Sequence, residues 1–235
     1  MKTFFKFYLN LFLKFFDLEI VSKDRQKINY SFDFDFPKYF GAHNKIIIFD
    51  IGANKGQSIN RFRSIFKNSI IHSFEPDEEC CKIIKNKYKN DKDIFINQVA
   101  ASNFNDKKDL NFYYHSTDNS FYKKNDDKIV KTSQVQTLKL DDYIKDKNIE
   151  KIHILKIDTQ SYNKEVIEGL KKTLSEKRVD IVEIEINLGQ NYEKKNSFFE
   201  IENFLQNYQL AGINKSGSIL NDKKFYLDVY YLKKV

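Results

Sequence analysis

Cysteine, glycine and proline are all scarce in this sequence. The 235 residues include two cysteines, seven glycines and two prolines. So little glycine and proline argues against a disordered chain or one made mostly of loops. The cysteines, Cys80 and Cys81, are adjacent, which suits neither a structural disulfide nor the spacing of zinc ligands. We therefore expect free thiols, no bound metal and a reducing compartment, the cytoplasm.

A block of basic residues is also absent. The 40 lysines and arginines outnumber the 33 acids and give a net charge of +7, but they are scattered among the acids. This pattern is typical of a solvated surface, and we expect no nucleic-acid partner. The length and the 41% of hydrophobic residues allow one large globular domain, with or without an appendage.

No hydrophobic run at the N-terminus is uninterrupted enough to cross a membrane comfortably. The first 20 residues are rich in Phe, Leu and Tyr, but polar residues recur at every fourth position: Lys2, Lys6, Asn10 and Lys14. On a helix they form one narrow polar stripe, and they interrupt the apolar core that a signal peptide needs. Two interpretations stay open. The helix docks on the protein's own body or a second subunit, or it lies on the inner face of the membrane.

After this helix and an irregular lead-in, which together span residues 1–44, hydrophobic and amphipathic segments alternate. The pattern predicts strands at 45–50, 70–75, 93–100, 151–158, 179–186 and 225–234. It predicts helices at 57–67, 77–88, 140–147, 163–176 and 197–208. We therefore expect an α/β domain over 45–235: a Rossmann-like, mostly parallel sheet with helices on both faces and an antiparallel final strand. Two extended segments, at 109–116 and 128–138, are expected to form a small antiparallel addition or a flap over the sheet's upper edge.

The turn after the first predicted strand lacks two common nucleotide-binding motifs. It matches neither G-x-G-x-x-G nor G-x-x-x-x-G-K-[ST], which disfavours a nicotinamide-dependent oxidoreductase. The spacing present is D-x-G-x-x-x-G, formed by Asp50, Gly52 and Gly56. Gly52 accommodates a positive φ, and Gly56 lets the next helix approach closely, with its N-terminus facing a ligand anion. Because Asp50 repels a diphosphate and attracts an ammonium or sulfonium, we expect an amino-acid derivative that carries both a carboxylate and a positive charge.

The second predicted strand ends in another acid. Glu75 is followed by Pro76, which stops the strand. A carboxylate at this position is able to accept two hydrogen bonds from a ribose diol. The alternative is that Asp50 and Glu75 are only turn and cap residues.

Six segments, in this order, resemble the FkbM-type family of class I S-adenosylmethionine-dependent methyltransferases: FDIGANKGQS, HSFEPDEE, VAAS, QTLKLDDYI, ILKIDTQSYNKEVIEGL and IVEIEI. The resemblance covers roughly residues 45 to 233 and implies S-adenosylmethionine as the cofactor. It implies that the methionine end is lined by Asp50, Gly52, Asn54 and Gly56. It places the ribose at Glu75, the adenine beside Gln98, Val99 and Ala100, and the transferred methyl near Asp158.

The family pattern is broken after Asp158. The resemblance leads us to expect L-K-I-D-x-[EQ]-G-x-E, but Ser161 stands in place of the glycine and Asn163 in place of the glutamate. The missing carboxylate puts any catalytic role at that position in doubt. Without the glycine, we expect the turn geometry at position 161 to differ.

Two residues are predicted to act on the acceptor. His115 is a candidate general base for an acceptor hydroxyl because imidazole titrates near neutrality, with an ordinary surface histidine as the alternative. Asp158 is predicted to accept a proton or to stabilise the sulfonium, with a helix cap as the alternative. Glu183 and Glu185, alternating on one strand, are candidates for binding a polyhydroxy acceptor, with ordinary residues of a polar sheet face as the alternative.

The sequence thus predicts a methyltransferase that acts on an oxygen of a small-molecule or carbohydrate acceptor. The resemblance extends this prediction to surface polysaccharide or glycolipid biosynthesis. A non-catalytic cofactor-binding or scaffold subunit is the alternative from another class. A homo-oligomer and peripheral membrane contact through the N-terminal helix both stay open.

Overall fold

The computed structural model describes residues 30–41, 45–189, 191–194, 197–217 and 225–235. The chain divides into two compact units, Met1–Ala42 and His43–Val235. In the first unit the described element is helix α2 (Tyr30–Phe40), where the sequence predicted an irregular lead-in. Its sequence does not predict a helix, because aromatic residues alternate with polar ones and Pro37 lies inside it. The predicted amphipathic helix over the first 20 residues lies outside the described residues.

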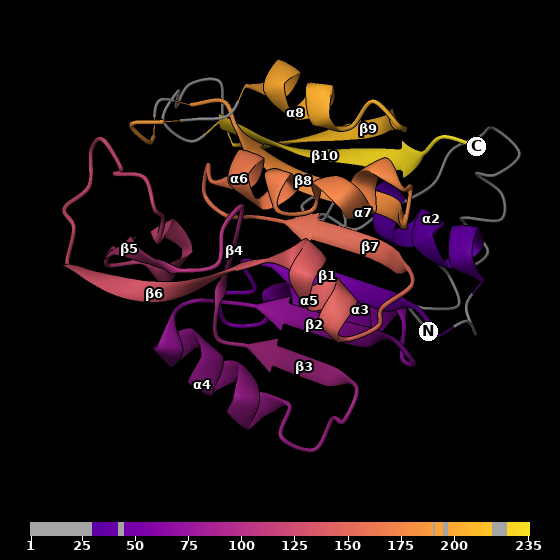
Figure 1. The fold of residues 1–235 in the computed structure, drawn as a ribbon, viewed down its shortest axis with the longest axis horizontal. Coiled ribbons are helices and arrows are strands. Elements are labelled where there is room, and N and C mark those ends of the chain that lie inside the picture. The colour runs from indigo at the N-terminus through magenta and orange to yellow at the C-terminus, as the bar shows by residue number, and fades with distance from the viewer. Residues whose placement is uncertain (1–29, 42–44, 190, 195–196, 218–224) are drawn as a thin grey trace, which may run out of the picture. The chain divides into compact units, whose positions relative to one another are not determined.

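Seven strands form the central sheet of the second unit. They are β1 (Ile47–Ile51), β2 (Ile70–Phe74), β3 (Ile94–Asn97), β7 (Ile152–Ile157), β8 (Val179–Asn187), β9 (Tyr208–Gly217) and β10 (Phe225–Lys233). Their order is β3-β2-β1-β7-β8-β10-β9, with parallel pairing from β3 to β8. β10 runs antiparallel to β8 and β9 (Figure 1). The predicted Rossmann-like sheet with an antiparallel last strand is confirmed. Strand β9, which carries few hydrophobic residues, was not predicted.

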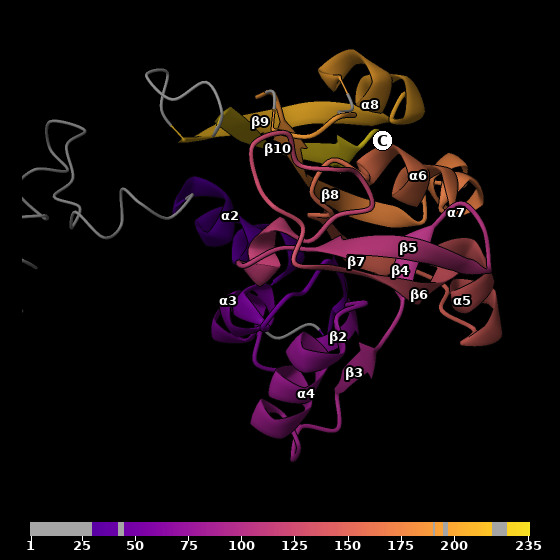
Figure 2. The ribbon, with the colours of Figure 1, turned by 90° about the vertical axis from the view of Figure 1, so that its left-hand side faces the viewer.

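Helices cover both faces of this sheet. They are α3 (Gln57–Ile65), α4 (Glu78–Lys87), α5 (Leu140–Asp146), α6 (Asn163–Glu168), α7 (Lys171–Ser175) and α8 (Phe198–Phe204). Figure 2 shows α3 and α4 on one side and α5 to α8 on the other. Alternate strand residues, such as Phe49, Leu155 and Val182, pack with the second group in the main hydrophobic core.

A second, three-stranded sheet is inserted between β3 and α5. It consists of β4 (Ala100–Ser102), β6 (Lys131–Lys139) and β5 (Lys107–Phe112), in that order. β5 and β6 are antiparallel, which confirms the predicted addition, and β4 adds a parallel strand. In Figures 1 and 2 this sheet lies beside the carboxyl ends of β1 and β7.

Two local differences from the prediction lie at or against β4. The strand expected at 93–100 stops at Asn97, and the chain enters β4 at Ala100. The helix expected at 163–176 is interrupted at Gly169, between α6 and α7. A Cβ atom on Gly169 would lie 2.0 Å from the carbonyl oxygen of Ser102. Glycine is therefore needed for this contact, which a sequence window around the helix does not reveal.

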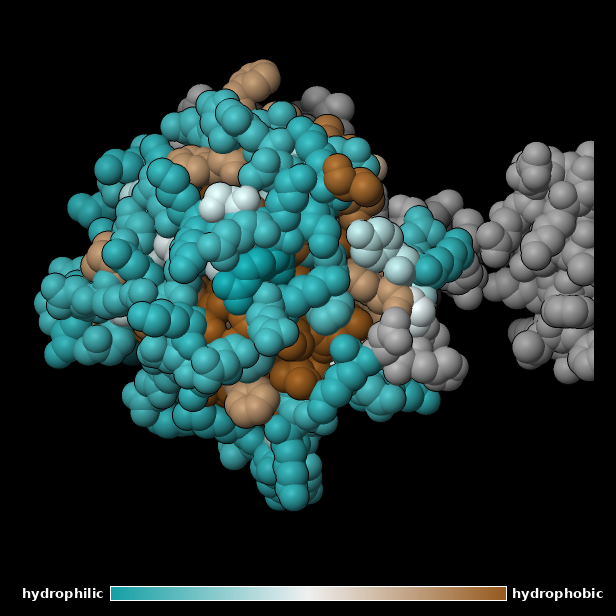
Figure 3. All heavy atoms as spheres, turned by 45° about the vertical axis from the view of Figure 1, so that its right-hand side comes forward, coloured by the Kyte–Doolittle hydropathy of each residue, from teal (hydrophilic) through white to brown (hydrophobic). Residues whose placement is uncertain are grey.

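The surface shown in Figure 3 is mainly hydrophilic, with hydrophobic residues visible chiefly near its centre. This agrees with charged residues making up 31% of the sequence. Among the described residues, none of the helices has the length and apolar character required to cross a membrane.

Candidate active site

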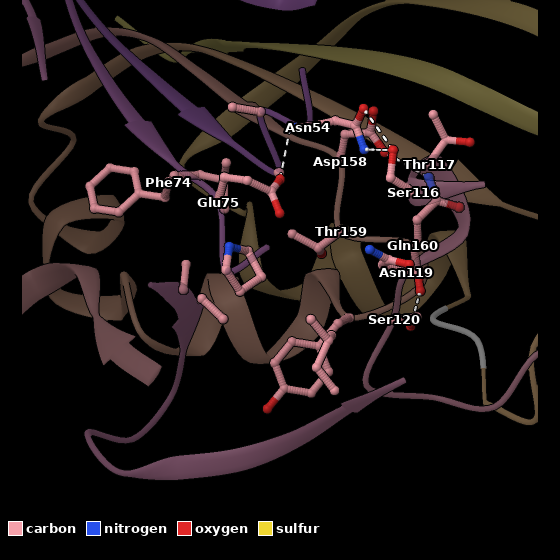
Figure 4. A pocket seen from close by; sticks show the side chains of 18 of the residues that line it. Asn54, Phe74, Glu75, Ser116, Thr117, Asn119, Ser120, Asp158, Thr159 and Gln160 are labelled. Carbon is pink, nitrogen blue, oxygen red and sulfur yellow. Dashed lines mark hydrogen bonds between the residues drawn. The ribbon is translucent and has the colours of Figure 1, made fainter. Parts of the chain in front are cut away.

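The site lies where the chain connections of the parallel sheet change direction. β1 leads to β2 on one side, whereas its other neighbour, β7, comes late in the sequence. Such a switch point is where open α/β sheets bind ligands. Here the structure has a first cavity of about 260 Å³ (Figure 4). Its lining comes from the β1–α3 loop, the ends of β2 and β7, the small sheet and residues 116–121.

The β1–α3 loop is held in a conformation that depends on glycine. Gly52 has a φ of 79°, and a Cβ atom there would lie 1.9 Å from the carbonyl oxygen of Asp158. Gly56, with a φ of 81°, precedes α3. Asn54 is also left-handed, with a φ of 47°, which asparagine tolerates better than most residues. The loop thus brings its backbone against β7 while the first residues of α3, Gln57 and Ser58, line the cavity.

Glu75 joins this loop to the end of β2. Its Oε2 accepts a hydrogen bond of 2.7 Å from the Asn54 N–H, and its Oε1 accepts one of 2.9 Å from the Asp77 N–H. Burial raises the pKa of Glu75 to about 7, although both backbone donors oppose the shift. Figure 4 shows its carboxylate at the cavity beside Asn54. Each oxygen keeps a second lone pair with which to accept a hydrogen bond from a ligand.

The rest of the first cavity is largely apolar. Its lining includes Phe74, Pro76, Ala100, Ala101, Leu110 and Phe121. Of the three residues expected beside an adenine, Ala100 lines the cavity, whereas Gln98 is exposed and neither it nor Val99 is part of the lining. Ala101 and Phe121 were not anticipated, because the chain turns into β4 and the 116–121 segment arrives from a distant part of the sequence.

Asp50 lies behind the cavity wall rather than in it. Its side chain is fully buried, and neither carboxylate oxygen has a hydrogen-bond partner in the described part of the chain. Lys156 Nζ is 3.8 Å from Asp50 Oδ1. Burial raises the pKa of Asp50, and the positive charges of Lys156 and Arg61 act against that shift. The direct cofactor contact expected of Asp50 stays a prediction.

A row of charged residues crosses the sheet beneath the site. Asp50, Lys156 and Glu183 are register partners on β1, β7 and β8. Arg61 from α3 forms a bidentate ion pair with Glu183. Both carboxylate oxygens of this glutamate are therefore paired within the row and do not bind a ligand. Burial alone would lower the pKa of Lys156, but the carboxylates of Asp158, Asp50 and Glu183 outweigh it and raise the pKa. Lys156 therefore stays charged.

Asp158 stands at the junction between the first cavity and a second one of about 520 Å³. Its Oδ2 is 3.2 Å from Lys156 Nζ, and its Oδ1 accepts a hydrogen bond of 2.9 Å from Gln160 Nε2. The same amide nitrogen donates to Glu185 Oε1 at 3.2 Å. These partners orient the carboxylate by side chains, whereas the cap interpretation requires backbone N–H donors. Three residues, Thr117, Asp158 and Gln160, line both cavities.

The loop that breaks the expected family pattern keeps a left-handed turn without glycine. Gln160 has a φ of 48° and Ser161 one of 76°. Ser161 is buried, and its hydroxyl has no hydrogen-bond partner among the residues described. Asn163 accepts a hydrogen bond of 2.8 Å from the Thr159 hydroxyl and donates one of 2.7 Å to the Glu185 carbonyl. Asn163 therefore connects the loop to β8 through hydrogen bonds.

The proposed base His115 is exposed and lines neither cavity. It precedes the short helix η2 (Ser116–Asp118), and its ring contacts Tyr114. The neighbouring Ser116 is the residue that reaches the site, accepting a hydrogen bond of 3.1 Å from Asn54 Nδ2. A catalytic role for His115 stays a prediction from the sequence.

Comparison with known proteins identifies the family. The family model described as "Methyltransferase FkbM domain" matches residues 50–210. The chain belongs to the FkbM methyltransferase family. S-adenosylmethionine is therefore its cofactor, and the protein is an S-adenosylmethionine-dependent methyltransferase. No curated protein matches the sequence.

Solved methyltransferase structures share the fold of this FkbM-family chain. The METTL16 MTase domain is 10% identical, with a TM-score of 0.52 over 96% of this chain and 77% of that one. An rRNA methylase from Streptococcus thermophilus is also 10% identical, with a TM-score of 0.50 over 88% of this chain and 96% of that one. At such identities the likeness establishes the Rossmann-like methyltransferase fold.

The residues of the first cavity fit S-adenosylmethionine. The carboxylate form of Glu75 suits a ribose diol, and the apolar wall of Phe74, Pro76 and Ala100 suits a purine ring. The N-terminus of α3 offers N–H groups to a carboxylate.

Proposed function

We propose that this enzyme transfers the methyl group of S-adenosylmethionine to a hydroxyl oxygen of a small, sugar-like acceptor bound in the second cavity. The observation that carries the proposal is the position of Asp158 on the walls of both cavities. A carboxylate at this junction is within reach of both the cofactor and the acceptor. Positioning two reactants on either side of one base is the main way such a site accelerates transfer.

The first cavity would hold the cofactor by its two ends. Glu75 would accept hydrogen bonds from the ribose, and the turn at Gly52 and Asn54, with the start of α3, would face the methionine end. When bound, the cofactor supplies an electrophilic methyl group on a sulfonium.

Asp158 would take the proton of the reacting hydroxyl. The methyl group would pass from the sulfonium sulfur to the acceptor oxygen, the proton of that oxygen would pass to Asp158, and S-adenosylhomocysteine would leave. Lys156 and Gln160 hold the Asp158 carboxylate in place.

The second cavity favours a small polar acceptor. It is lined by carboxylates, by the amides of Gln160, Asn187 and Asn191, and by the rings of Tyr192 and Tyr226. Carboxylates and amides bind hydroxyl groups, and tyrosine rings pack against sugar rings, whereas a nucleic-acid phosphate would be repelled. The family resemblance extends the proposal to sugar units of a surface polysaccharide or glycolipid.

The test combines binding and product analysis. Calorimetry should show that S-adenosylhomocysteine binds the purified protein. Transfer of a 13C-methyl group from S-adenosylmethionine is then measured on a panel of methyl glycosides, with the position of the methyl read by NMR. An O-methyl product supports the proposal. N-methylation alone, or no transfer to any glycoside while the protein methylates RNA, would overturn it.

A further inference from the structure

The second cavity is built from parts of the chain that lie far apart in the sequence. Its walls come from η2, the segment around residues 124–127, the loop after β7, the end of β8, residues 191–192 and the start of β10. It opens onto Asp158 and has roughly twice the volume of the first cavity, about 520 against 260 Å³. An acceptor in it would lie against residues that the sequence motifs do not include.

Negative charge dominates the lining of this cavity. Five carboxylates line it, Asp118, Asp126, Asp127, Asp158 and Glu185, against the single ammonium group of Lys124. That ammonium is already 2.7 Å from Asp118 and 3.1 Å from Asp127. Asp158 is in turn 3.2 Å from the ammonium group of Lys156, so five carboxylates face two ammonium groups on a protein whose net charge is +7. A positive occupant would balance the excess of carboxylates.

The excess is concentrated where Glu185 and Asp158 face the same amide. Gln160 Nε2 donates to both carboxylates, at 2.9 Å to Asp158 and 3.2 Å to Glu185. Asp228 is the register partner of Glu185 on β10 and adds a third acid nearby. Burial raises the pKa of Glu185 well above its ordinary value, and the charge of Asp158 raises it further. A cation placed between these groups would oppose this rise and favour the ionised form of Glu185.

Asn187 provides an independent indication of a ligand. Its side chain is only 7% exposed, and Oδ1 accepts a hydrogen bond of 3.0 Å from the Gly189 N–H. Among the described residues, nothing accepts a hydrogen bond from its Nδ2, although Asn187 lines the cavity. The Nδ2 atom is not buried but accessible from the cavity, so an acceptor on an occupant is able to reach it. A hydroxyl oxygen of an occupant would serve as that acceptor.

A bound metal ion is a poor explanation for the acids. In the described part of the chain, no three His, Cys, Asp or Glu side chains are arranged to hold a metal. The carboxylates are instead spread along a cavity of about 520 Å³, which suits an organic molecule with several polar groups. The rings of Tyr192 and Tyr226 add flat surfaces that attract both sugar rings and cations.

We infer that the acceptor is a small polyhydroxylated molecule that carries a protonated amine, such as an amino sugar, with the amine held by the carboxylates around Glu185 and a hydroxyl held by Asn187. The inference rests on the proposed function, because it takes the second cavity as the acceptor site. The amine serves recognition, and the reacting atom remains a hydroxyl oxygen beside Asp158.

The test uses three glycosides that differ mainly in charge. Protein saturated with S-adenosylhomocysteine is titrated at neutral pH with methyl glucosaminide, methyl glucoside and methyl glucuronide, which are cationic, neutral and anionic. We expect the amine to bind about tenfold or more tighter than the neutral sugar, and the acid weakest. Equal affinities, tighter binding of the glucuronide, or no binding of any probe would overturn the inference.

Variants test which side chains cause the preference for the amine over the neutral sugar. Asp126→Asn and Glu185→Gln each remove one acid with little change of shape, and each should reduce the ratio of amine to neutral affinity at least about threefold. Asp146→Asn removes an exposed acid at the end of α5, outside both cavities, and should leave the ratio unchanged. If neither cavity variant changes the ratio, the inference fails. Loss of S-adenosylhomocysteine binding would instead count against the proposed function, so that binding is measured first.

Discussion

The two cavities differ in chemistry and in how the sequence encodes them. The first is smaller and largely apolar, with Glu75 as its polar anchor. The second is larger and acidic, and its walls come from segments with no common spacing. The cofactor is the same throughout the family, whereas each acceptor is particular to its enzyme. The comparison teaches that a local motif suffices to build a site for a shared ligand, and that tertiary structure builds the site for a particular one.

Asp158, which belongs to both cavities, should give the largest effect. Asp158→Asn keeps the shape and removes the charge, so we expect the single-turnover rate to fall by on the order of 10²-fold or more. The affinity for S-adenosylhomocysteine should change much less, because the ribose contacts lie elsewhere. Rate and melting temperature are measured on the same preparation. A rate that equals that of the wild type would remove Asp158 from the mechanism.

Glu75 tests the first cavity alone. Glu75→Gln removes the charge and turns an amide donor toward one of the two backbone N–H groups, so binding of S-adenosylhomocysteine should weaken by about ten- to a hundredfold. Titration of the variant by calorimetry measures this, with Asp146→Asn as the matched control. Amine preference in the second cavity should be unaffected in cofactor-saturated protein. Wild-type affinity for S-adenosylhomocysteine in the variant would contradict the assignment.

The raised pKa of Glu75 predicts that the affinity for S-adenosylhomocysteine depends on pH. Nothing in the second cavity requires such a dependence. Because the pKa in the cofactor-free protein is about 7, roughly a tenth of this carboxyl is ionised at pH 6 and most of it at pH 8. If the ribose binds the ionised form, affinity for S-adenosylhomocysteine should be up to about tenfold weaker at pH 6 than at pH 8. Calorimetry across this range measures it, and a profile in Glu75→Gln as steep as that of the wild type would contradict it.

The same shift has a consequence for stability, with a definite sign. The pKa of Glu75 is raised from 4.5 to about 7 in the folded protein, which therefore binds a proton that the unfolded chain releases. The contribution of this group to the free energy of unfolding is fully present below pH 4.5 and is lost as pH rises to about 7. Comparison of denaturation curves for the wild type and Glu75→Gln isolates it.

Ser161, in the loop between the cavities, should give the smallest effect. Ser161→Gly relieves a left-handed φ and removes a buried hydroxyl that has no partner among the described residues. We expect the free energy of unfolding to rise by about 1 kcal/mol, measured by urea denaturation. Asn148→Gly is the control, since Asn148 is also left-handed but exposed and asparagine tolerates that region. A loss of stability in Ser161→Gly would show that the serine is favoured by contacts that outweigh the strain.

The sequence predicted those parts of the site that are local in the chain. Gly52, Asn54, Glu75 and Asp158 follow strand ends, so strand periodicity and the family motif were enough to place them at the cavities. Residues brought in by tertiary packing were missed. Asn187 and Tyr226 face the same cavity because β8 and β10 are neighbours in the sheet, and no spacing in the sequence records that.

Burial was equally hard to foresee. Asp50 and Glu183 were expected to face a ligand, but in the structure both are buried, Asp50 beside Lys156 and Glu183 in an ion pair with Arg61. The fold itself was largely predictable, because alternating strands and helices admit few arrangements. Strand β9 and the break at Gly169 were not, since the first depends on pairing with β10 and the second on contact with Ser102.

The charged row beneath the site also constrains how the sheet assembles. A slip of one residue between β1 and β7 would turn Asp50 toward the apolar face packed by α5 to α8. A slip of two would place Asp50 beside Ile154 or beside Asp158, an aliphatic or a like-charged neighbour, and would leave Lys156 without its partner. An unpaired buried charge costs roughly 3–5 kcal/mol, so misaligned strands are rejected during folding. The charged row therefore favours a single register for the central strands of this enzyme.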